Sequence, residues 1–176
     1  MKFVARIWKF GDNINTDLIL PNVAFYLTPQ EQLKYIFRAN RPGWVDLVKP
    51  GDILIGGKGR DVLYGGSEAD VFLFKSLTDT GTTSSTRDVI ADFRLDHDRI
   101  DLSAIDARSN VGGNDIFRFV DNRAFSGLSG ELHYVSRTVA GVSSTIVEGD
   151  VNGDRLADFQ IELSGRYTLV AADFVL

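Results

Sequence analysis

Two adjacent nine-residue segments carry the side chains best suited to chemistry. Residues 56–64 read Gly-Gly-Lys-Gly-Arg-Asp-Val-Leu-Tyr, and residues 65–73 read Gly-Gly-Ser-Glu-Ala-Asp-Val-Phe-Leu. Both follow G-G-x-G-x-D-x-U-x, where U is large and apolar, except that Glu68 replaces the third glycine of the second copy. Glycines permit turns with positive φ, and aspartate supplies the anionic oxygen that Ca²⁺ prefers. The pattern predicts calcium ligation by tight turns, through Gly57, Gly59, Asp61, Gly66 and Asp70.

The alternative interpretation is a pair of glycine-rich hairpin turns with solvated aspartates, which two copies in register disfavour. Two nonapeptides make one coil of a roll, so Asp61 is expected to stack near Asp79 and Asp70 near Asp88. We therefore add Asp88 to the predicted ligands. Asp79 lies in a loop rich in serine and threonine, residues 76–86, where its register can be a coincidence. So short a roll predicts only one or two ions.

A second calcium loop is predicted at residues 150–158, Asp-Val-Asn-Gly-Asp-Arg-Leu-Ala-Asp. Oxygen-bearing side chains fall at loop positions 1, 3, 5 and 9, and a main-chain carbonyl supplies position 7, as in an EF-hand. The predicted ligands are Asp150, Asn152, Asp154, Leu156 and Asp158. The position-12 glutamate and flanking helices are missing, so the alternative is an Asn-Gly hairpin turn that carries aspartates.

Composition divides the chain in two. Residues 1–58 hold eight basic and five acidic side chains, all four prolines and both tryptophans, whereas residues 59–176 hold eleven basic and nineteen acidic side chains. We therefore expect two segments, 1–58 and 59–176. The net charge of −5 argues against a nucleic-acid partner, and the absence of cysteine excludes disulfides and thiolate metal sites. No run is apolar enough for membrane insertion, and residues 1–6 do not read as a cleavable secretory signal.

Short elements are predicted throughout. Residues 2–10 and 52–56 read as strands, and Thr28, Pro29 and Glu31 give the start signals of a helix between them, a βαβ-like α/β fragment. Later strands are expected at residues 70–74, 87–93, 98–103, 113–120, 131–135, 144–148, 158–163 and 167–170. Strands separated by short polar turns predict a mainly β fold, a roll or a sandwich. Asp12, Thr16 and Asp17 read as residues that pin a loop.

The N-terminal residues carry a family resemblance. Residues 8–21, with Gly-Asp-Asn-Ile-Asn-Thr-Asp and Pro21, together with residues 51–58, resemble the opening third of the small subunit of 3-isopropylmalate dehydratase, which has the aconitase swivelling-domain fold. In that family a serine- and arginine-containing loop that binds the substrate carboxylate follows the glycine pair. Here Gly59, Arg60 and Asp61 follow instead. The resemblance implies ancestry of the fragment and not dehydratase activity.

Residues 57–176 resemble the C-terminal domain of serralysin-type secreted metalloproteases and related RTX proteins. The resemblance rests on the nonapeptides and on residues 69–74, 87–93, 98–103, 125–127 and 173–176. It implies a short parallel calcium β-roll leading into a β-sandwich, a secreted protein, and export by a type I secretion apparatus that reads a signal at residues 173–176. The zinc helix of the protease is absent, because His97 and His133 lack its spacing, so no enzymatic activity is expected. Neither histidine is expected to bind a metal.

Three hypotheses stay open at this point. The chain is a non-catalytic, calcium-binding secreted β-domain fused to a swivel-like fragment, which we favour. It is otherwise a small-subunit component of the dehydratase with a replaced tail, or an engineered or recombined chimera without an evolved function. A homodimer through open sheet edges is also expected.

Overall fold

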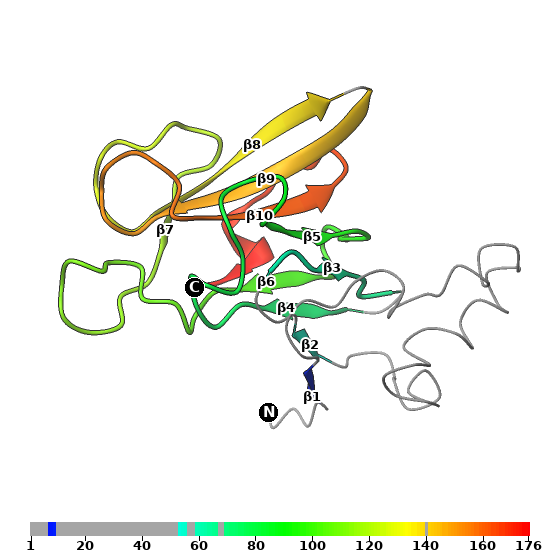
Figure 1. Ribbon diagram of the computed structural model, residues 1–176, viewed down its shortest axis with the longest axis horizontal. Coiled ribbons are helices and arrows are strands. Elements are labelled where there is room, and N and C mark those ends of the chain that lie inside the picture. Colours follow the sequence, from blue (N-terminus) through cyan, green and yellow to red (C-terminus); the bar gives the residue numbers. More distant parts are fainter. Residues whose placement is uncertain (1–6, 10–52, 56–58, 67–68, 140) are drawn as a thin grey trace, which may run out of the picture.

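The computed structural model describes residues 7–9, 53–55, 59–66, 69–139 and 141–176, and strands dominate these ranges (Figure 1). A first, parallel sheet has the order β1 (Ile7–Lys9), β2 (Ile53–Ile55), β4 (Val71–Leu73), β6 (Arg99–Asp101), β11 (Phe174–Val175). A second sheet has the order β3 (Val62–Leu63), β5 (Asp88–Ile90), β10 (Phe159–Ser164), β9 (Val142–Asp150), β8 (Glu131–Val139), β7 (Arg118–Phe119). The 3-10 helix η3 (Ala171–Asp173) precedes β11.

Strands β2 to β6 alternate between the two sheets, which is the path of a β-roll. Strand β3 pairs with β5, and β5 with β10, in parallel; β10, β9 and β8 then pair antiparallel. The long β8–β9 hairpin extends past the roll (Figure 1). The predicted fold class, a short parallel β-roll leading into a β-sandwich, is confirmed. Strands β1 and β2, which belong to the predicted α/β fragment, continue the first sheet of the roll.

The core lies between the two sheets and follows from strand periodicity. In β10, Phe159, Ile161 and Leu163 are buried while Gln160 and Glu162 are partly exposed, because successive side chains of a strand point to opposite faces. Phe72 and Ile100 oppose them from the first sheet and are almost fully buried. The shared core therefore holds the turns at the ends of the sheets in place.

The coils of the roll differ in length. Leu54 pairs with Phe72, two nonapeptides further along the chain, as the repeat period predicts. Val62 pairs with Val89 and Phe72 with Ile100, so these offsets are longer by one nonapeptide or slightly more. The polar loop at residues 76–86 adds the extra length and folds back on β10, where the Thr80 hydroxyl donates to the Gln160 carbonyl at 2.6 Å.

Most predicted strands are present, with different lengths. Residues 167–170 form no strand, and that prediction is wrong: the Tyr167 N–H donates to the Thr145 hydroxyl at 2.9 Å instead of to a neighbouring strand. Of residues 113–120, only Arg118–Phe119 are extended. The helix predicted after Thr28 and the loop with Asp12, Thr16 and Asp17 lie outside the described residues.

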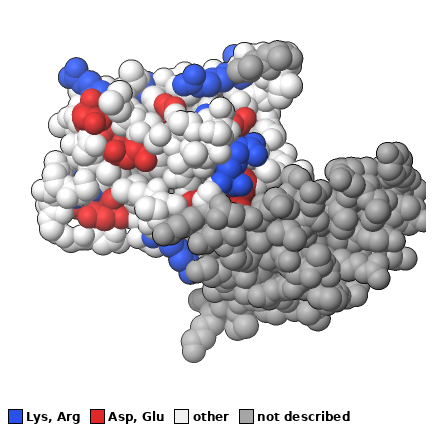
Figure 2. All heavy atoms as spheres, viewed as in Figure 1, with Lys and Arg blue, Asp and Glu red and all other residues white. Residues whose placement is uncertain are grey.

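Acidic and basic side chains alternate over the face shown in Figure 2, so this face carries no field of a single sign. Within the described ranges no helix is long and apolar enough to cross a bilayer.

The fold predicts a steric limit at Gly149, which pairs with Phe159 across β9 and β10. A Cβ atom on Gly149 would overlap the Phe159 ring, and Phe159 is fully buried. Gly149→Ala is therefore expected to lower the free energy of unfolding by about 1–3 kcal/mol, as overpacking does. Denaturant unfolding measures this loss.

Gly112→Ala is the matched control, because a Cβ there meets no atom within 4 Å and its stability should be unchanged. Equal stabilities of the two variants would contradict the packing of β10 on β9.

Candidate metal centre

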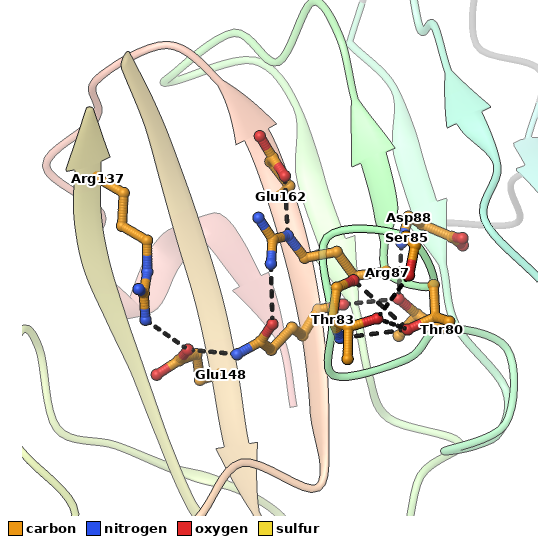
Figure 3. Close-up of polar contacts among 10 residues, drawn as sticks. Thr80, Thr83, Ser85, Arg87, Asp88, Arg137, Glu148 and Glu162 are labelled. Atoms are coloured by element: carbon orange, nitrogen blue, oxygen red, sulfur yellow. Dashed lines mark hydrogen bonds and ion pairs between the residues drawn. The ribbon is translucent and has the colours of Figure 1, made fainter. Parts of the chain in front are cut away.

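At one end of the roll, the first repeat meets the turn that precedes β5. The Asp61 N–H donates to Oδ1 of Asp88 at 2.9 Å, in the next coil of the chain. Both aspartates are buried, with 7% and 1% of their surface exposed. The Asp88 N–H in turn donates to the Thr80 hydroxyl at 2.8 Å (Figure 3). Two acidic residues from successive coils thus lie together with little exposure to solvent.

The Asp61–Asp88 site disfavours ionisation of its own carboxyl groups. Burial raises the pKa of Asp88 to about 8, and the charges of Asp61 and Asp79 act in the same direction, against the N–H bond from Asp61 and the charge of Arg60. Asp88 therefore holds a proton near neutral pH, unless a cation replaces that proton.

At the other end, the second repeat meets the turn between β5 and β6. The Asp70 N–H donates to Oδ1 of Asp98 at 3.1 Å, and the Gly65 and Gly66 N–H groups donate to the two oxygens of Asp92, each at 2.9 Å. Gly66 has φ of +97°, and a Cβ on Gly65 would lie 2.7 Å from Oδ2 of Asp70. Glycine is therefore required at both positions, at Gly66 by its positive φ and at Gly65 by the close approach of Asp70.

The predicted stacking of aspartates is wrong. Asp61 lies against Asp88 and not Asp79, and Asp70 against Asp98 and not Asp88. The reason is the loop at residues 76–86, which lengthens the coil, while Asp79 accepts the N–H groups of Lys75 and Ser76 in that loop.

Asp92 and Asp98 were missed among the predicted site residues. Asp98 is buried and also accepts the Arg94 N–H at 2.8 Å. Their signal in the sequence is their spacing from the repeat positions, which exceeds one regular coil by roughly a further nonapeptide. That spacing becomes visible only when the inserted loop is counted.

The predicted loop at residues 150–158 is organised by its first aspartate. Asp150 is fully buried; its Oδ1 accepts the N–H groups of Asn152 and Gly153, at 3.2 and 2.6 Å, and its Oδ2 accepts that of Arg155 at 2.9 Å. Arg155 has φ of +71° at loop position 6, where an EF-hand has its glycine. The backbone therefore bends as in a calcium loop, although the bend falls on an arginine.

The other predicted ligands of this loop follow the same course. Asp158 accepts the Val151 N–H at 2.7 Å and the Asn152 side-chain amide at 3.0 Å. The side-chain oxygens of Asn152 and Asp154 each accept an N–H two residues later, at 2.8 Å. Hydrogen bonds thus join Asp150, Asn152 and Asp158, and the side chains of Asn152, Asp154 and Leu156 are exposed.

The side chains of these turns offer the oxygen ligands that calcium prefers, but fewer of them than one ion needs. Among the residues whose positions the structure describes, no three acidic or histidine side chains gather as a metal site. Ca²⁺ binds six to eight oxygens and accepts peptide carbonyls, so a cage here needs main-chain oxygens from the turns. Gly59 is described and has φ of +98°, whereas Gly57 lies outside the described residues.

The histidines lie as turn and strand residues. His97 is exposed, with Nδ1 3.2 Å from the Leu95 carbonyl oxygen. His133 is buried in β8, with Nε2 2.9 Å from Glu148.

Comparison with protein families covers most of the chain. The model described as peptidase M10 serralysin C terminal matches residues 52–176. The chain belongs to the serralysin C-terminal family. This family comprises the non-catalytic C-terminal domain of secreted proteins. The residues matched by the serralysin C-terminal model include strand β2, which pairs with strand β4 of the second nonapeptide.

The N-terminal part matches other proteins. The small subunit of an isopropylmalate/citramalate isomerase from Methanocaldococcus jannaschii is 44% identical over 55 residues, which cover 31% of this chain and 33% of that protein. The match to a homoaconitase small subunit from Thermus thermophilus is longer than segment 1–58: it is 31% identical over 119 residues and covers 56% of this chain and 72% of that protein. The chain spans about a third of the length of the first of these relatives. Two family origins therefore meet in one chain.

Two solved structures resemble the chain. Subunits R2 and R3 of the mannuronan C5-epimerase AlgE6 from Azotobacter vinelandii are 24% and 27% identical, with TM-scores of 0.46 and 0.47. They cover 72% and 71% of this chain, and 71% and 62% of those chains are covered.

The turns of the serralysin C-terminal domain yield a prediction at Asp98. Asp98→Asn leaves one oxygen where two N–H groups donate, so the free energy of unfolding should fall by about 1–3 kcal/mol. Urea unfolding tests this, with Asp96→Asn as control, because Asp96 is exposed and has φ of 67°, which asparagine tolerates. An Asp98 variant as stable as the control would contradict the bonds between coils.

A second prediction concerns Asp88 in metal-free protein. Its pKa of about 8 lies above the ordinary 3.8, so the folded state keeps a proton that the unfolded chain releases. Stability should therefore decrease as pH rises from about 4 to about 8.

Asp88→Asn keeps an oxygen for the Asp61 N–H and removes the titration. Urea unfolding in chelator at pH 5 and pH 8.5 should show the variant gaining stability over the wild type only at the higher pH. The same difference at both pH values would contradict a proton on Asp88.

Proposed function

We propose that residues 59–176 form a non-catalytic, calcium-binding domain of a secreted protein that completes its fold when it meets calcium outside the cell. The observation that carries the proposal is the Asp61–Asp88 pair. These two acidic residues are buried together, and the pKa of Asp88 is raised to about 8 by burial and by its acidic neighbours. A proton on Asp88 neutralises only one of the two buried carboxylates, whereas a bound divalent cation neutralises both.

The residues that would hold the ion are those of facing turns. At one end they are the carboxylates of Asp61 and Asp88 with carbonyl oxygens of the Gly57 and Gly59 turn. At the other they are Asp70 and the Gly66 turn. When bound, Ca²⁺ supplies positive charge and draws the oxygens of successive coils to one centre. The carboxylates keep lone pairs beyond the N–H groups they accept.

Folding then depends on the calcium concentration. The second segment has nineteen acidic and eleven basic side chains, which repel one another on balance, and its glycines are entropically costly to order. An ion that binds only the folded state stabilises it by about 2.7 kcal/mol at a hundredfold excess over Kd. At low calcium, inside a cell, the segment would stay loose enough for export.

Export by a type I secretion apparatus fits the place of residues 173–176. In the fold, Asp173 is buried and its carboxylate accepts the Val170 N–H at 2.8 Å, while Phe174–Val175 pair with β6. A transporter that reads these residues needs them free of the sheet. Recognition before folding is therefore part of the proposal.

The N-terminal match favours a second candidate, a small-subunit role in a leucine-pathway dehydratase. Mixing the chain with a large subunit of 3-isopropylmalate dehydratase and assaying dehydration of the substrate would test it. The sequence that follows Lys58 lacks the family's serine- and arginine-containing loop, so we expect no activity.

Calorimetric calcium titration of the full chain tests the calcium proposal. We expect binding of one or two ions in chelator-treated protein, and loss of binding when Asp61→Asn and Asp70→Asn are combined. Asp150→Asn with Asp154→Asn assigns any remaining binding to the second loop.

Asp121→Asn with Asp96→Asn is the control pair, because both aspartates are exposed and neither is a predicted ligand. Wild-type protein that takes up no calcium would refute the proposal. Equal binding by the control pair and the Asp61/Asp70 pair would refute the assignment to the turns.

A further inference from the structure

His133 has two hydrogen-bond partners, and both are acceptors. Its Nδ1 lies 2.7 Å from the Arg123 carbonyl oxygen, and its Nε2 lies 2.9 Å from Oε2 of Glu148. The side chain is buried, with 6% of its surface exposed, and the Phe125 ring lies over it at a centroid distance of 4.1 Å. Neither ring nitrogen faces a donor.

This geometry fixes the protonation state of the imidazole. A carbonyl oxygen and an ionised carboxylate can only accept, so both ring nitrogens must carry hydrogen. A neutral imidazole would leave one buried nitrogen facing an acceptor, which forfeits a hydrogen bond. His133 therefore fits its site as an imidazolium cation.

The charged groups around His133 support the cation. Glu148 also accepts from the Gln160 side-chain amide at 2.7 Å and lies 3.8 Å from Arg137 (Figure 3). Glu131, two residues before His133 on β8, is buried and paired with Arg118. Burial by itself lowers the pKa of His133, but the bonds to Glu148 and Arg123 and the charges of Glu148 and Glu131 outweigh it, so the pKa is raised.

Residues 121–127, which we call the latch segment, are tied to β8 by these groups. His133 holds the Arg123 carbonyl, and Glu131 accepts the Ser126 N–H at 2.6 Å and its hydroxyl at 2.8 Å. The Tyr134 N–H donates to the Asp121 carbonyl at 3.1 Å. Only the imidazolium can make both His133 bonds at once, so proton loss sets the bond to Arg123 in competition with the bond to Glu148.

We propose that His133 is a proton-operated latch that fastens residues 121–127 to β8 when protonated and loosens them when the imidazole becomes neutral. The trigger is the loss of one proton from the ring, after which a nitrogen lone pair faces Arg123 or Glu148. The latch segment also contacts the predicted calcium loop, because the Arg155 Nε–H donates to the Ser126 carbonyl at 3.2 Å, so its pH dependence is tested in calcium-replete protein.

The sign of the pH dependence follows from the raised pKa. A histidine whose folded pKa lies above its unfolded value stabilises the fold fully below about pH 6.5. That stabilisation is lost as pH rises through the folded pKa. The latch is thus closed in acid and loosens as pH rises through the raised pKa of His133.

Nitrogen-15 NMR of the imidazole rings tests the protonation state, since the chain has only two histidines. In calcium-replete full-length protein we expect the His133 ring to titrate above pH 6.5. Glu148→Gln keeps an acceptor and removes the charge, so it should lower the pKa of His133 by about one unit or more.

Glu162→Gln is the matched control, because Glu162 pairs with Arg87 at 2.8 Å and reaches Glu148 only through Arg87 and Gln160. It should leave the titration of His133 unchanged. A wild-type His133 that titrates below pH 6.5, or one that responds equally to both substitutions, would overturn the proposal.

Hydrogen exchange of the wild type tests the latch itself and needs no variant. After correction for the pH dependence of intrinsic exchange rates, the protection of residues 121–127 should fall about tenfold or more between pH 6 and pH 9. The protection of β10 should stay the same over this range. Unchanged protection of the segment over that range would show that proton loss does not release it.

Discussion

Peptide N–H groups of the turns donate to carboxylates one coil further along, and the order of the roll depends on these bonds. Asp61 donates to Asp88, Asp70 to Asp98, and Gly65 with Gly66 to Asp92. Buried N–H groups must find acceptors, and a carboxylate accepts more strongly than a neutral oxygen. Because each bond joins one coil to the next, it fixes the length of a coil and the facing of its turns.

The same bonds gather negative charge where water is scarce. Burial makes an ionised Asp88 costly, and its acidic neighbours add to that cost, which is why its pKa rises to about 8. A divalent cation can neutralise such a pair and use carbonyl oxygens at the same time, so calcium and coil order become one equilibrium. The β8 latch solves a similar problem differently, since buried Glu148 has an imidazolium partner within the chain.

Sequence periodicity predicted much of this arrangement. Leu63 and Phe72, the large apolar residues of the two nonapeptides, are buried in the core. Leu54 pairs with Phe72 at the same two-repeat period, but this pairing was not predicted, because residues 52–56 were assigned to the N-terminal fragment. Periodicity could not predict that Val62 pairs with Val89 and Phe72 with Ile100, because the polar loop at residues 76–86 lengthens the coil and leaves the strand patterns unchanged. Asp92 and Asp98 were missed for that reason. Residues 167–170 alternate like a strand, but their partner is a hydroxyl, which no alternation reveals. The loop at residues 150–158 was predicted as a calcium loop; its positive φ at Arg155 was not predicted.

The serralysin C-terminal match begins at residue 52 and so includes β2, which extends the first sheet of the roll by pairing with β4. We infer above all that calcium completes the fold by neutralising the carboxylates of the turns. Thermal unfolding of the full chain in millimolar calcium and in chelator tests this most directly. The account predicts a melting temperature about 5–10 °C higher with calcium. Identical melting temperatures in the two conditions would contradict it.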